Sequence, residues 1–434
     1  MTDAPESENQ SPLRGAPLVG RRAVLSWCFY DWANSSYPTV IVTFVFAAYF
    51  TTTLSPDPET GTAQWGSALA LSGLGVALLA PMLGALADQA GPRKPWIGGF
   101  TLIAAACAMG LWWIEPDPAY GLIALVLVAV GNGAFEFGQV FYNAMLPDLA
   151  ARGRLGRISG WAWGLGYAGG LVCLTLALVL FVLEKHALIP LDRAAAEHVR
   201  ITGPLVGLWF LVFALPLFWF TPDAVAHRAV SPGALMAGLR SLWRTLRALP
   251  KQSEVGRFLL ARMIYTDGLN TLFAFGGVYA AGSFGMSFQE ILVFGILLNV
   301  AAGLGAAVFS WVDDWIGAKR TIVISLIGLI GAGSAILAVE SRTAFTVLGC
   351  VIGVFLGPAQ SASRSMMARL APVESRTQLF GLYALSGKAT AFVGPALVGW
   401  VTFLADSQRA GMATIPVFFL IGLVLLLPLR DPKD

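Results

Sequence analysis

The chain has 434 residues, of which 56% are hydrophobic and 12% are charged, and its formal net charge is +3. A soluble protein usually carries about twice that charged fraction, so the composition excludes an ordinary soluble domain. It indicates instead a protein with many apolar segments that lie in a membrane.

A polar tail opens the chain. Residues 1–20 are rich in Ser, Pro and Glu and have no apolar core, which is typical of a disordered cytoplasmic segment and not of a cleavable signal peptide. A helix needs roughly 20 apolar residues to cross the bilayer core. By this criterion we predict about twelve spans, at 23–50, 64–87, 96–114, 119–146, 158–183, 201–220, 256–281, 287–312, 321–340, 343–370, 378–404 and 412–429.

A polar segment at 222–255 divides the spans into an N-terminal bundle of six, within 21–221, and a C-terminal bundle of six, within 256–434. Leucines recur at helical spacing between 235 and 249, with Arg and Lys on the other faces. This pattern predicts an amphipathic helix that lies on the anionic membrane surface, in contact with lipids. We interpret it as a tether between the bundles, with a lipid-sensing role as the alternative.

The placement of Lys and Arg predicts the orientation. These residues gather in the linker, near both termini and in the loops after even-numbered spans, and they are sparse in the other loops. Cytoplasmic loops carry the excess of basic residues, so we expect both termini on the cytoplasmic side of the cytoplasmic (inner) membrane. The net positive charge thus reflects topology and gives no reason to expect a nucleic-acid partner.

The chain offers no pattern for metal or covalent chemistry. Its four cysteines lie far apart within spans, where they suit small packing positions, and no Cys/His cluster has metal-ligand spacing. There is no phosphate-binding loop, and the spans hold no nucleophile with its base. We therefore expect no metal, no cofactor and no enzyme activity.

A loop signature occurs twice, once in each half, and reads Asp88-Gln-Ala-Gly91-Pro-Arg93-Lys94 and Asp314-Trp-Ile-Gly317-Ala-Lys319-Arg320. Other pairs repeat in the same way, such as Asp31 and Asn34 in the first span with Asp267 and Asn270 in the seventh, and Gln139 in the fourth with Gln360 in the tenth. Such duplication predicts an all-α membrane protein with two pseudo-symmetric six-helix bundles and a binding site between them.

The paired signature resembles that of the major facilitator superfamily of secondary transporters. The stretch Tyr30-Asp31-Trp32-Ala33-Asn34-Ser35-Ser36-Tyr37 resembles the opening of its vacuolar amino-acid effluxer-like (autophagy-related) branch. So do Ser363-Arg364-Ser365 and the segment from Phe380 to Ala389. The resemblance implies a monomeric transporter that works by alternating access and, in fungi, is associated with amino-acid export from the vacuole.

In this superfamily the signature loops are regarded as a latch on the outward-open state. We expect Asp88 and Asp314 to accept hydrogen bonds at the N-termini of neighbouring helices. We also expect the basic residues of both loops to reach acids such as Asp148; the gating set is Asp88, Gly91, Arg93, Lys94, Asp148, Asp314, Gly317, Lys319 and Arg320. The alternative is that these charges only set the topology. Ser310 stands where the first copy has Gly84, which weakens the expectation for the second latch.

Polar residues at membrane depth are candidates for function because they are costly there. The predicted substrate-binding residues are Tyr30, Asp31, Asn34, Gln139, Asn270, Gln360, Arg364 and Lys388. Arg364 and Lys388 would bind a carboxylate. Glu136, then Asp267, are the candidates for proton coupling. The alternative is that the acids and bases only pair to hold helices together. Arg262, near the cytoplasmic end, is expected to extend to the lipid headgroups.

The cargo that best fits these charges is an amino acid or a related zwitterion, with protons as a candidate coupling ion. A lipid flippase on the same fold remains the main alternative, and peptides, sugars and cell-wall fragments remain open.

Overall fold

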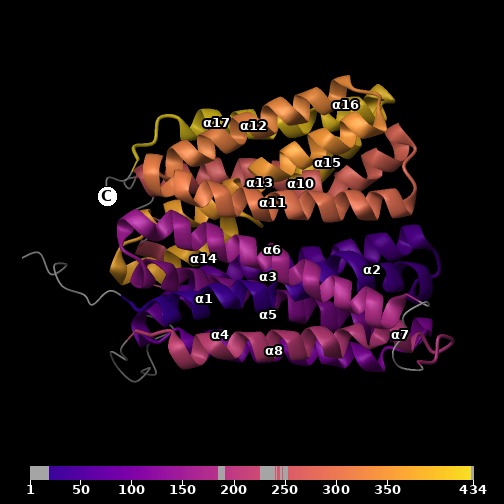
Figure 1. Cartoon of the computed structure of the whole chain (residues 1–434), viewed down its shortest axis with the longest axis horizontal. Coiled ribbons are helices and arrows are strands. Elements are labelled where there is room, and N and C mark those ends of the chain that lie inside the picture. The colour runs from indigo at the N-terminus through magenta and orange to yellow at the C-terminus, as the bar shows by residue number, and fades with distance from the viewer. Residues whose placement is uncertain are drawn as a thin grey trace, which may run out of the picture.

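The computed structural model describes residues 19–183, 191–224, 240, 242–244, 247 and 253–431, and these contain helices and no strand. The predicted tail, 1–20, and the predicted linker helix fall almost entirely outside the described residues. Figure 1 shows the N-terminal half, in indigo to magenta, stacked against the C-terminal half, in orange to yellow. The axes of the long helices are roughly aligned with one another.

The N-terminal bundle is built from helices and short irregular turns of helix. Its elements are α1 (Arg21–Asn34), the π-helix η1 (Tyr37–Phe44), α2 (Val45–Tyr49), the π-helix η2 (Phe50–Leu54), α3 (Pro58–Ala90), α4 (Lys94–Gly110), η3 (Leu111–Trp113), η4 (Pro118–Tyr120), α5 (Gly121–Leu149), η5 (Arg152–Arg154), α6 (Leu155–Ala177), the π-helix η6 (Leu178–Val182), α7 (Glu197–Arg200) and α8 (Thr202–Phe220).

The C-terminal bundle follows the same plan. Its elements are α10 (Ser253–Phe284), α11 (Phe288–Ile316), α12 (Ala318–Ala338), α13 (Arg342–Leu370), η8 (Val373–Ser375), α14 (Arg376–Ser386), α15 (Val393–Ala405), α16 (Gln408–Met412) and α17 (Thr414–Leu426).

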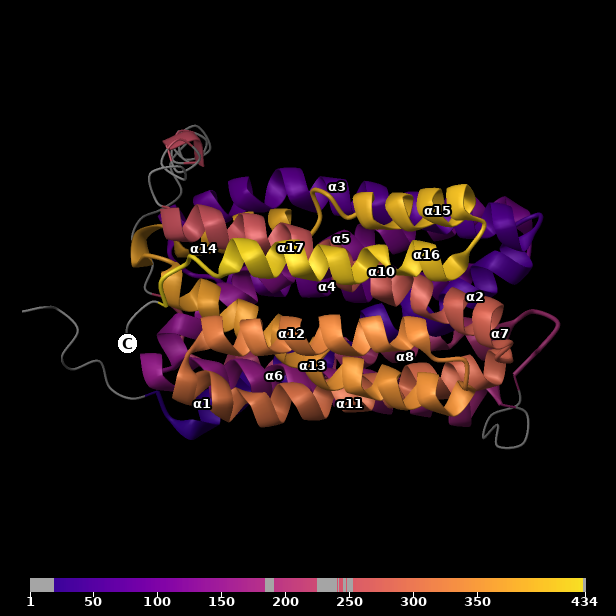
Figure 2. The ribbon, with the colours of Figure 1, turned by 90° about the horizontal axis from the view of Figure 1, so that it is seen from above.

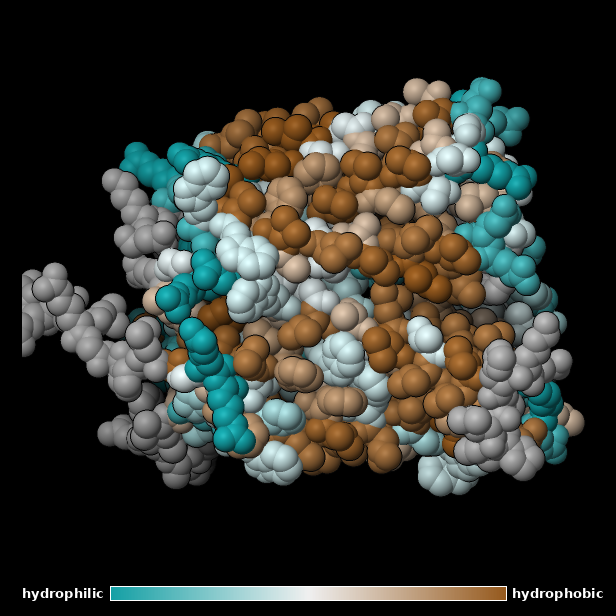
Figure 3. All heavy atoms as spheres, viewed as in Figure 1, coloured by the Kyte–Doolittle hydropathy of each residue, from teal (hydrophilic) through white to brown (hydrophobic). Residues whose placement is uncertain are grey.

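Ten segments of the described chain are long and apolar enough to cross a membrane. Two further crossings, α10 and the pair α14–α15, run along the same direction in both ribbon views, which brings the arrangement to the predicted twelve (Figures 1 and 2). The space-filling view shows a broad apolar band with polar residues concentrated at both ends (Figure 3). This distribution is that of a protein surrounded by lipid along its length.

The eleventh predicted span is not one continuous helix, as 378–404 implied. It breaks into α14 and α15, with turns at 387–392 between them. Pro395 explains the break, because it lacks the N–H group that would bond the carbonyl of Ala391 and its ring clashes with the preceding turn. The break gives Lys388 its place, since this residue sits in the turns and not on a regular helix face.

Both signature loops lie at one end of the molecule, which we call the signature end and define by residues 88–94 and 314–320. There the two bundles meet along two seams, α3 against α14 and α6 against α11. The seams need glycine: a Cβ atom at Gly381 would lie 2.5 Å from the Ala80 carbonyl oxygen, and one at Gly160 would lie 2.5 Å from the Ala306 carbonyl oxygen. The duplicated sequence therefore forms two equivalent close contacts between the bundles.

Candidate functional site

A cavity of about 530 Å³ lies between the two bundles at mid-depth. Its wall comes from α1, η1, α5 and α6 on one side and from α10, α11, α13, α14 and the turns after α14 on the other. Eight residues singled out in the sequence line it: Asp31, Asn34, Glu136, Gln139, Asn270, Gln360, Arg364 and Lys388. The helical faces that the sequence marked as polar thus converge from both halves of the chain.

Lys388 forms an ion pair across the cavity with Glu136, with 2.7 Å between Nζ and Oε1. The two side chains are 31% and 21% exposed, so both reach the open space. The stem of Lys388 passes α3 at Gly73, where a Cβ atom would lie 3.8 Å from its Cδ. The pair joins the two bundles and is also accessible to a solute in the cavity.

Arg364 occupies a different setting. Its guanidinium pairs with Asp31 at 2.8 Å, and the two side chains are only 2% and 7% exposed. It also donates to Asn143 Oδ1 at 3.1 Å, to Ser159 Oγ at 2.9 Å and to the Ser159 carbonyl at 2.6 Å. Arg364 on α13 is therefore held by α1, α5 and α6 of the other bundle.

Neutral groups complete the contacts around the cavity. Tyr167 on α6 donates its hydroxyl hydrogen to Oε1 of Gln360 on α13 at 2.8 Å, which is another contact between the bundles. Asn270 Nδ2 on α10 donates to the carbonyl of Gly387, at the break after α14, with a distance of 3.3 Å. Gln139 and Asn34 contribute amide groups to the wall.

Two predicted residues lie elsewhere. Tyr30 is 1% exposed and packs inside the N-terminal bundle, where its hydroxyl bonds Thr101 at 2.8 Å, so the structure does not place it in the cavity. Asp267 is 2% exposed and lies outside the cavity lining, beside Thr390 at the helix break. Its Oδ1 is buried and has no hydrogen-bond partner among the described residues. Asp267 thus faces the interior of the C-terminal bundle.

The expectation for Arg262 was wrong. This residue does not extend to the lipid; it lines the cavity from α10. Its Nη1 donates to the carbonyl of Tyr383 at 2.5 Å and to Ser386 Oγ at 2.7 Å. Its guanidinium carbon lies 3.4 Å from the centre of the Tyr383 ring. Arg262 is therefore held toward α14 and away from the membrane surface.

At the signature end the two repeated aspartates make equivalent contacts. Asp88, at the end of α3, accepts hydrogen bonds from the backbone N–H groups of Thr377 and Gln378 at 2.9 and 2.8 Å, at the start of α14. Asp314, at the end of α11, accepts one from the N–H of Arg157 at 3.1 Å, at the start of α6, and pairs with the Arg157 side chain at 3.3 Å. Each carboxylate meets the positive end of a helix in the opposite bundle.

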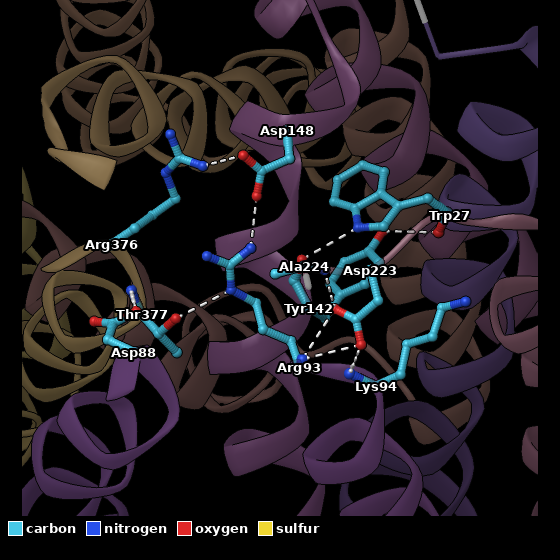
Figure 4. A network of polar contacts seen from close by, with 10 residues as sticks. All are labelled: Trp27, Asp88, Arg93, Lys94, Tyr142, Asp148, Asp223, Ala224, Arg376 and Thr377. Atoms are coloured by element: carbon cyan, nitrogen blue, oxygen red, sulfur yellow. Dashed lines mark hydrogen bonds and ion pairs between the residues drawn. The ribbon is translucent and has the colours of Figure 1, made fainter. Parts of the chain in front are cut away.

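Of the four basic residues in the signature loops, Arg93 reaches Asp148, at 2.6 Å. Figure 4 shows Arg93 between Asp148 and Thr377, with Arg376 of the other bundle on the far side of Asp148. Arg93 Nε donates to Thr377 Oγ1 at 3.1 Å, and Arg376 forms an ion pair with Asp148. Asp148 is thus bound by an arginine from each bundle.

The other loop cations do not reach Asp148. Lys94 donates its Nζ hydrogen to the Phe218 carbonyl at 3.0 Å, within its own bundle. Lys319 donates to the carbonyls of Leu427 and Leu429 at 2.8 and 2.5 Å, after α17. Arg320 has no ion pair in the described part of the chain. Gly91 and Gly317 have φ angles of 95° and 94°, which permit the turns at the ends of α3 and α11.

Several residues of these networks were not predicted. Ser159 bonds Arg364 and also donates to the Ser361 carbonyl at 2.7 Å. Asp313 pairs with Arg369 at 2.6 Å, with both side chains 3% exposed. Asp223 caps the start of α4 by accepting from the N–H groups of Arg93 and Lys94 (Figure 4). The charged types were visible in the sequence, but nothing there signalled their partners.

The cavity is closed toward the signature end. The hydrogen bonds and ion pairs found between the bundles in the described residues cluster there and at mid-depth, from Asp88 and Asp314 to the Arg364 network. In the other direction the cavity wall continues along η1, at Thr39 and Phe44, and along the first turns of α11. The geometry is that of two bundles pressed together at one end around a central site.

Comparison with known proteins identifies the family to which the chain belongs. The family described as "Vacuole effluxer Atg22 like" matches residues 67–433. The chain belongs to this family. An uncharacterized MFS-type transporter of Bacillus subtilis (strain 168), YxiO, is 24% identical to this Atg22-like protein over 404 residues, which cover 92% of this chain and 93% of the relative. Autophagy-related protein 22 of Saccharomyces cerevisiae (strain ATCC 204508 / S288c) is 22% identical over 385 residues, covering 77% and 70%.

Solved structures share the fold. The human organic anion transporter MFSD10 superposes with a TM-score of 0.73 at 15% identity, covering 95% of this chain and all of that one. The proton:xylose symporter XylE superposes with a TM-score of 0.74 at 11% identity, covering 95% and 96%. The Atg22-like chain therefore has the fold of the major facilitator superfamily and is a transporter of that superfamily, which implies a small-molecule substrate.

Proposed function

We propose that this Atg22-like transporter carries an amino acid or a related zwitterion across the cytoplasmic membrane by alternating access. The observation that carries the proposal is the Lys388–Glu136 pair, which spans the cavity at 2.7 Å and is partly exposed to it. Residues of one chain line the cavity on both sides, which supports our proposal that the monomer transports.

A zwitterion suits this pair better than a neutral solute does. When the pair separates, each charge loses its counter-ion, and only water or a group of the solute can take its place in the cavity. An ammonium group next to Glu136 and a carboxylate next to Lys388 would replace each lost partner by a group of the same charge. A sugar offers hydroxyl groups only and leaves the two charges without counter-ions.

Alternating access would follow from the two seams. With the signature loops on the cytoplasmic side, as the distribution of Lys and Arg predicts, the present arrangement is closed to the cytoplasm. Opening that side would require the Asp88 and Asp314 contacts and the Arg364–Asp31 pair to separate. The bundles would then rock around the central site.

Proton coupling is part of the proposal. Glu136 would bind a proton when Lys388 moves away, because a lone carboxylate at this depth is costly. Asp267 is the second candidate, since its Oδ1 is buried and has no hydrogen-bond partner among the described residues. The expected result is that Glu136→Gln no longer moves protons with the substrate, measured with a pH-sensitive dye inside proteoliposomes. Unchanged proton movement in that variant would place the coupling elsewhere.

The test of the proposal is Lys388→Ala. Uptake into proteoliposomes should be abolished, while the purified variant keeps the melting temperature of the parent protein within a few degrees, because the pair is partly exposed. Two variants serve as controls. Lys388→Arg keeps the positive charge at this position, and Arg257→Ala removes an exposed cation from α10 outside the cavity.

Binding identifies the cargo, since a ligand that binds the folded state raises its melting temperature. Amino acids, dipeptides, sugars and lipid headgroups should be compared at acidic and neutral pH. Stabilisation by an amino acid in the parent protein and not in Lys388→Ala supports the proposal. Stabilisation by lipid headgroups alone, or parent-level amino-acid uptake by Lys388→Ala, contradicts it.

A further inference from the structure

The charges that line the cavity do not balance. Five charged side chains line it, two acidic and three basic: Asp31, Glu136, Arg262, Arg364 and Lys388. Asp31 pairs with Arg364, and Glu136 pairs with Lys388. Arg262 forms no ion pair in the described part of the chain. If both pairs and Arg262 are ionised, the cavity wall has one positive charge in excess.

The partners of Arg262 are neutral acceptors. Its Nη1 donates to the Tyr383 carbonyl and to Ser386 Oγ, both at the end of α14, and its guanidinium carbon lies 3.4 Å from the centre of the Tyr383 ring. These contacts fix the position of the group without neutralising it. Nε is buried and has no hydrogen-bond partner among the residues that the structure describes. A guanidinium has five N–H donors, so part of its capacity to bind a planar acid remains unused.

Arg364 does not offer the same opportunity. Its donors are taken by Asp31, Asn143 and both oxygens of Ser159. A solute carboxylate could bind there only by displacing one of these groups and leaving it buried without a partner. Lys388 already forms an ion pair with Glu136. Among the cavity cations of the described chain, Arg262 alone has no anion beside it.

The location of Arg262 brings it next to the accessible pair. A Cβ atom at Gly387 would lie 3.1 Å from Nη1 and 3.3 Å from Nη2 of Arg262, so the guanidinium lies directly against the backbone just before Lys388. The absence of a side chain at Gly387 is what permits this approach. An anionic group bound to Arg262 would therefore lie beside Gly387, the residue that precedes Lys388 of the Lys388–Glu136 pair.

We propose that Arg262 is the primary docking site for the anionic group of the solute, and that this group is a carboxylate. The carboxylate binds the guanidinium from the cavity side. The ammonium group of the same solute binds Glu136. This rests on the proposed function and deepens it, because it makes Arg262 the first contact of the carboxylate that Lys388 also attracts. It requires that every solute of this site has an anionic group.

The experiment measures thermal stabilisation of the purified full-length chain by matched solutes. Each amino acid is supplied as the free acid, as its amide and as the amine without the carboxyl group. In the parent protein the free acids should stabilise and the other two forms should not. In Arg262→Gln the dissociation constant of the free acids should rise about 10- to 100-fold, as expected for loss of a hydrogen bond to a charged group.

Two variants serve as controls. Arg257→Gln removes a charge of the same kind from the exposed side of α10 and should leave binding unchanged. Arg262→Lys keeps the charge but not the two-pronged geometry, and its affinity should fall between those of the parent protein and Arg262→Gln. A correctly folded Arg262→Gln is recognised by a melting temperature without ligand that matches that of Arg257→Gln.

The outcomes separate this inference from the proposed function. If free acids bind the parent protein and Arg262→Gln equally, or bind neither, the assignment of Arg262 is wrong. If amides or amines bind and depend on Lys388 and Glu136, the cavity still serves transport but Arg262 does not select the solute. If free acids depend on Arg262 but are indifferent to Lys388→Ala, the inference stands and the proposed role of Lys388 fails. Should Arg262→Gln not fold, the same comparison is made with Arg262→Lys against the parent protein.

Discussion

The Arg364–Asp31 and Lys388–Glu136 pairs both connect the two bundles, with nitrogen-to-oxygen distances of 2.8 and 2.7 Å. Their surroundings differ. The first pair is at most 7% exposed, and its guanidinium has further acceptors in Asn143 and Ser159; the second pair is 21% to 31% exposed. The distance between two charges therefore does not reveal what a pair does.

The difference between the pairs lies in the cost of separating them. Buried charges that lose their partner inside protein cannot be solvated, whereas partly exposed ones can exchange their partner for water or solute. We infer that the Arg364 network holds the bundles together in the state closed at the signature end. The Lys388–Glu136 pair, by contrast, is placed to respond to a ligand.

The largest effect on stability is expected from Arg364→Met. This change removes the cation and leaves Asp31 buried without a counter-ion, which should lower the free energy of unfolding by about 3–5 kcal/mol. The measurement is chemical unfolding of the purified variant in detergent. Arg257→Met, on the exposed side of α10, is the control and should change stability little. A loss under about 1 kcal/mol would show that the network is not a structural lock.

A smaller effect is expected from Gly381→Val at the seam between α3 and α14. A Cβ atom there would lie 2.5 Å from the Ala80 carbonyl oxygen, so the seam cannot close without a shift. Overpacking of this kind costs about 1–3 kcal/mol, and the closed state bears that cost. Gly399→Val makes the same change on α15, where a Cβ atom would have no neighbour within 4 Å among the described residues.

The readout for the seam variant is access to the cavity from the signature side. A cysteine in place of Gln139 should react faster with a membrane-impermeant thiol reagent from that side in Gly381→Val than in Gly399→Val. Cys28, Cys107 and Cys173 are buried, so background labelling from them is low. Equal rates in the two variants would mean that the seam does not control access.

The fold could be predicted from two patterns in the sequence. Apolar runs predicted about twelve spans, and the duplication predicted two bundles; the equivalence of Asp88 with Asp314 reappears in the contacts that both make with helix N-termini. The broken eleventh crossing was missed, although Gly387 and Pro395 were visible signals. A count of apolar residues registers the length of a span and not the loss of a single backbone donor.

The site was predicted less completely, because hydrophobic patterns do not tell which polar face of a helix meets the partner bundle. On α10 the sequence predicted Asp267 and Asn270, yet the cavity is lined by Arg262, Leu269 and Asn270 and not by Asp267. In the first span Tyr30, on α1, and Tyr37, the first residue of η1, pack inside the N-terminal bundle instead. Which face is turned to the cavity depends on contacts with helices far away in the sequence.

The smallest effect on stability should come from the Lys388–Glu136 pair itself. A double-mutant cycle with Lys388→Gln and Glu136→Gln isolates the interaction between the two side chains. Because the pair is partly exposed, we expect a coupling free energy of about 0.2–1 kcal/mol from unfolding measurements. A matching cycle with Arg364→Gln and Asp31→Asn should give a clearly larger value.

Transport measurements should give a different order of importance for the two ion pairs than stability measurements do. Lys388→Gln should abolish uptake although it scarcely changes the folded state, because the solute loses a charge that it must contact. A coupling energy for Lys388 and Glu136 as large as that for Arg364 and Asp31 would remove the distinction between them. The accessible pair would then be a second lock, and a solute could not open it with the interactions that a single carboxylate and ammonium group provide.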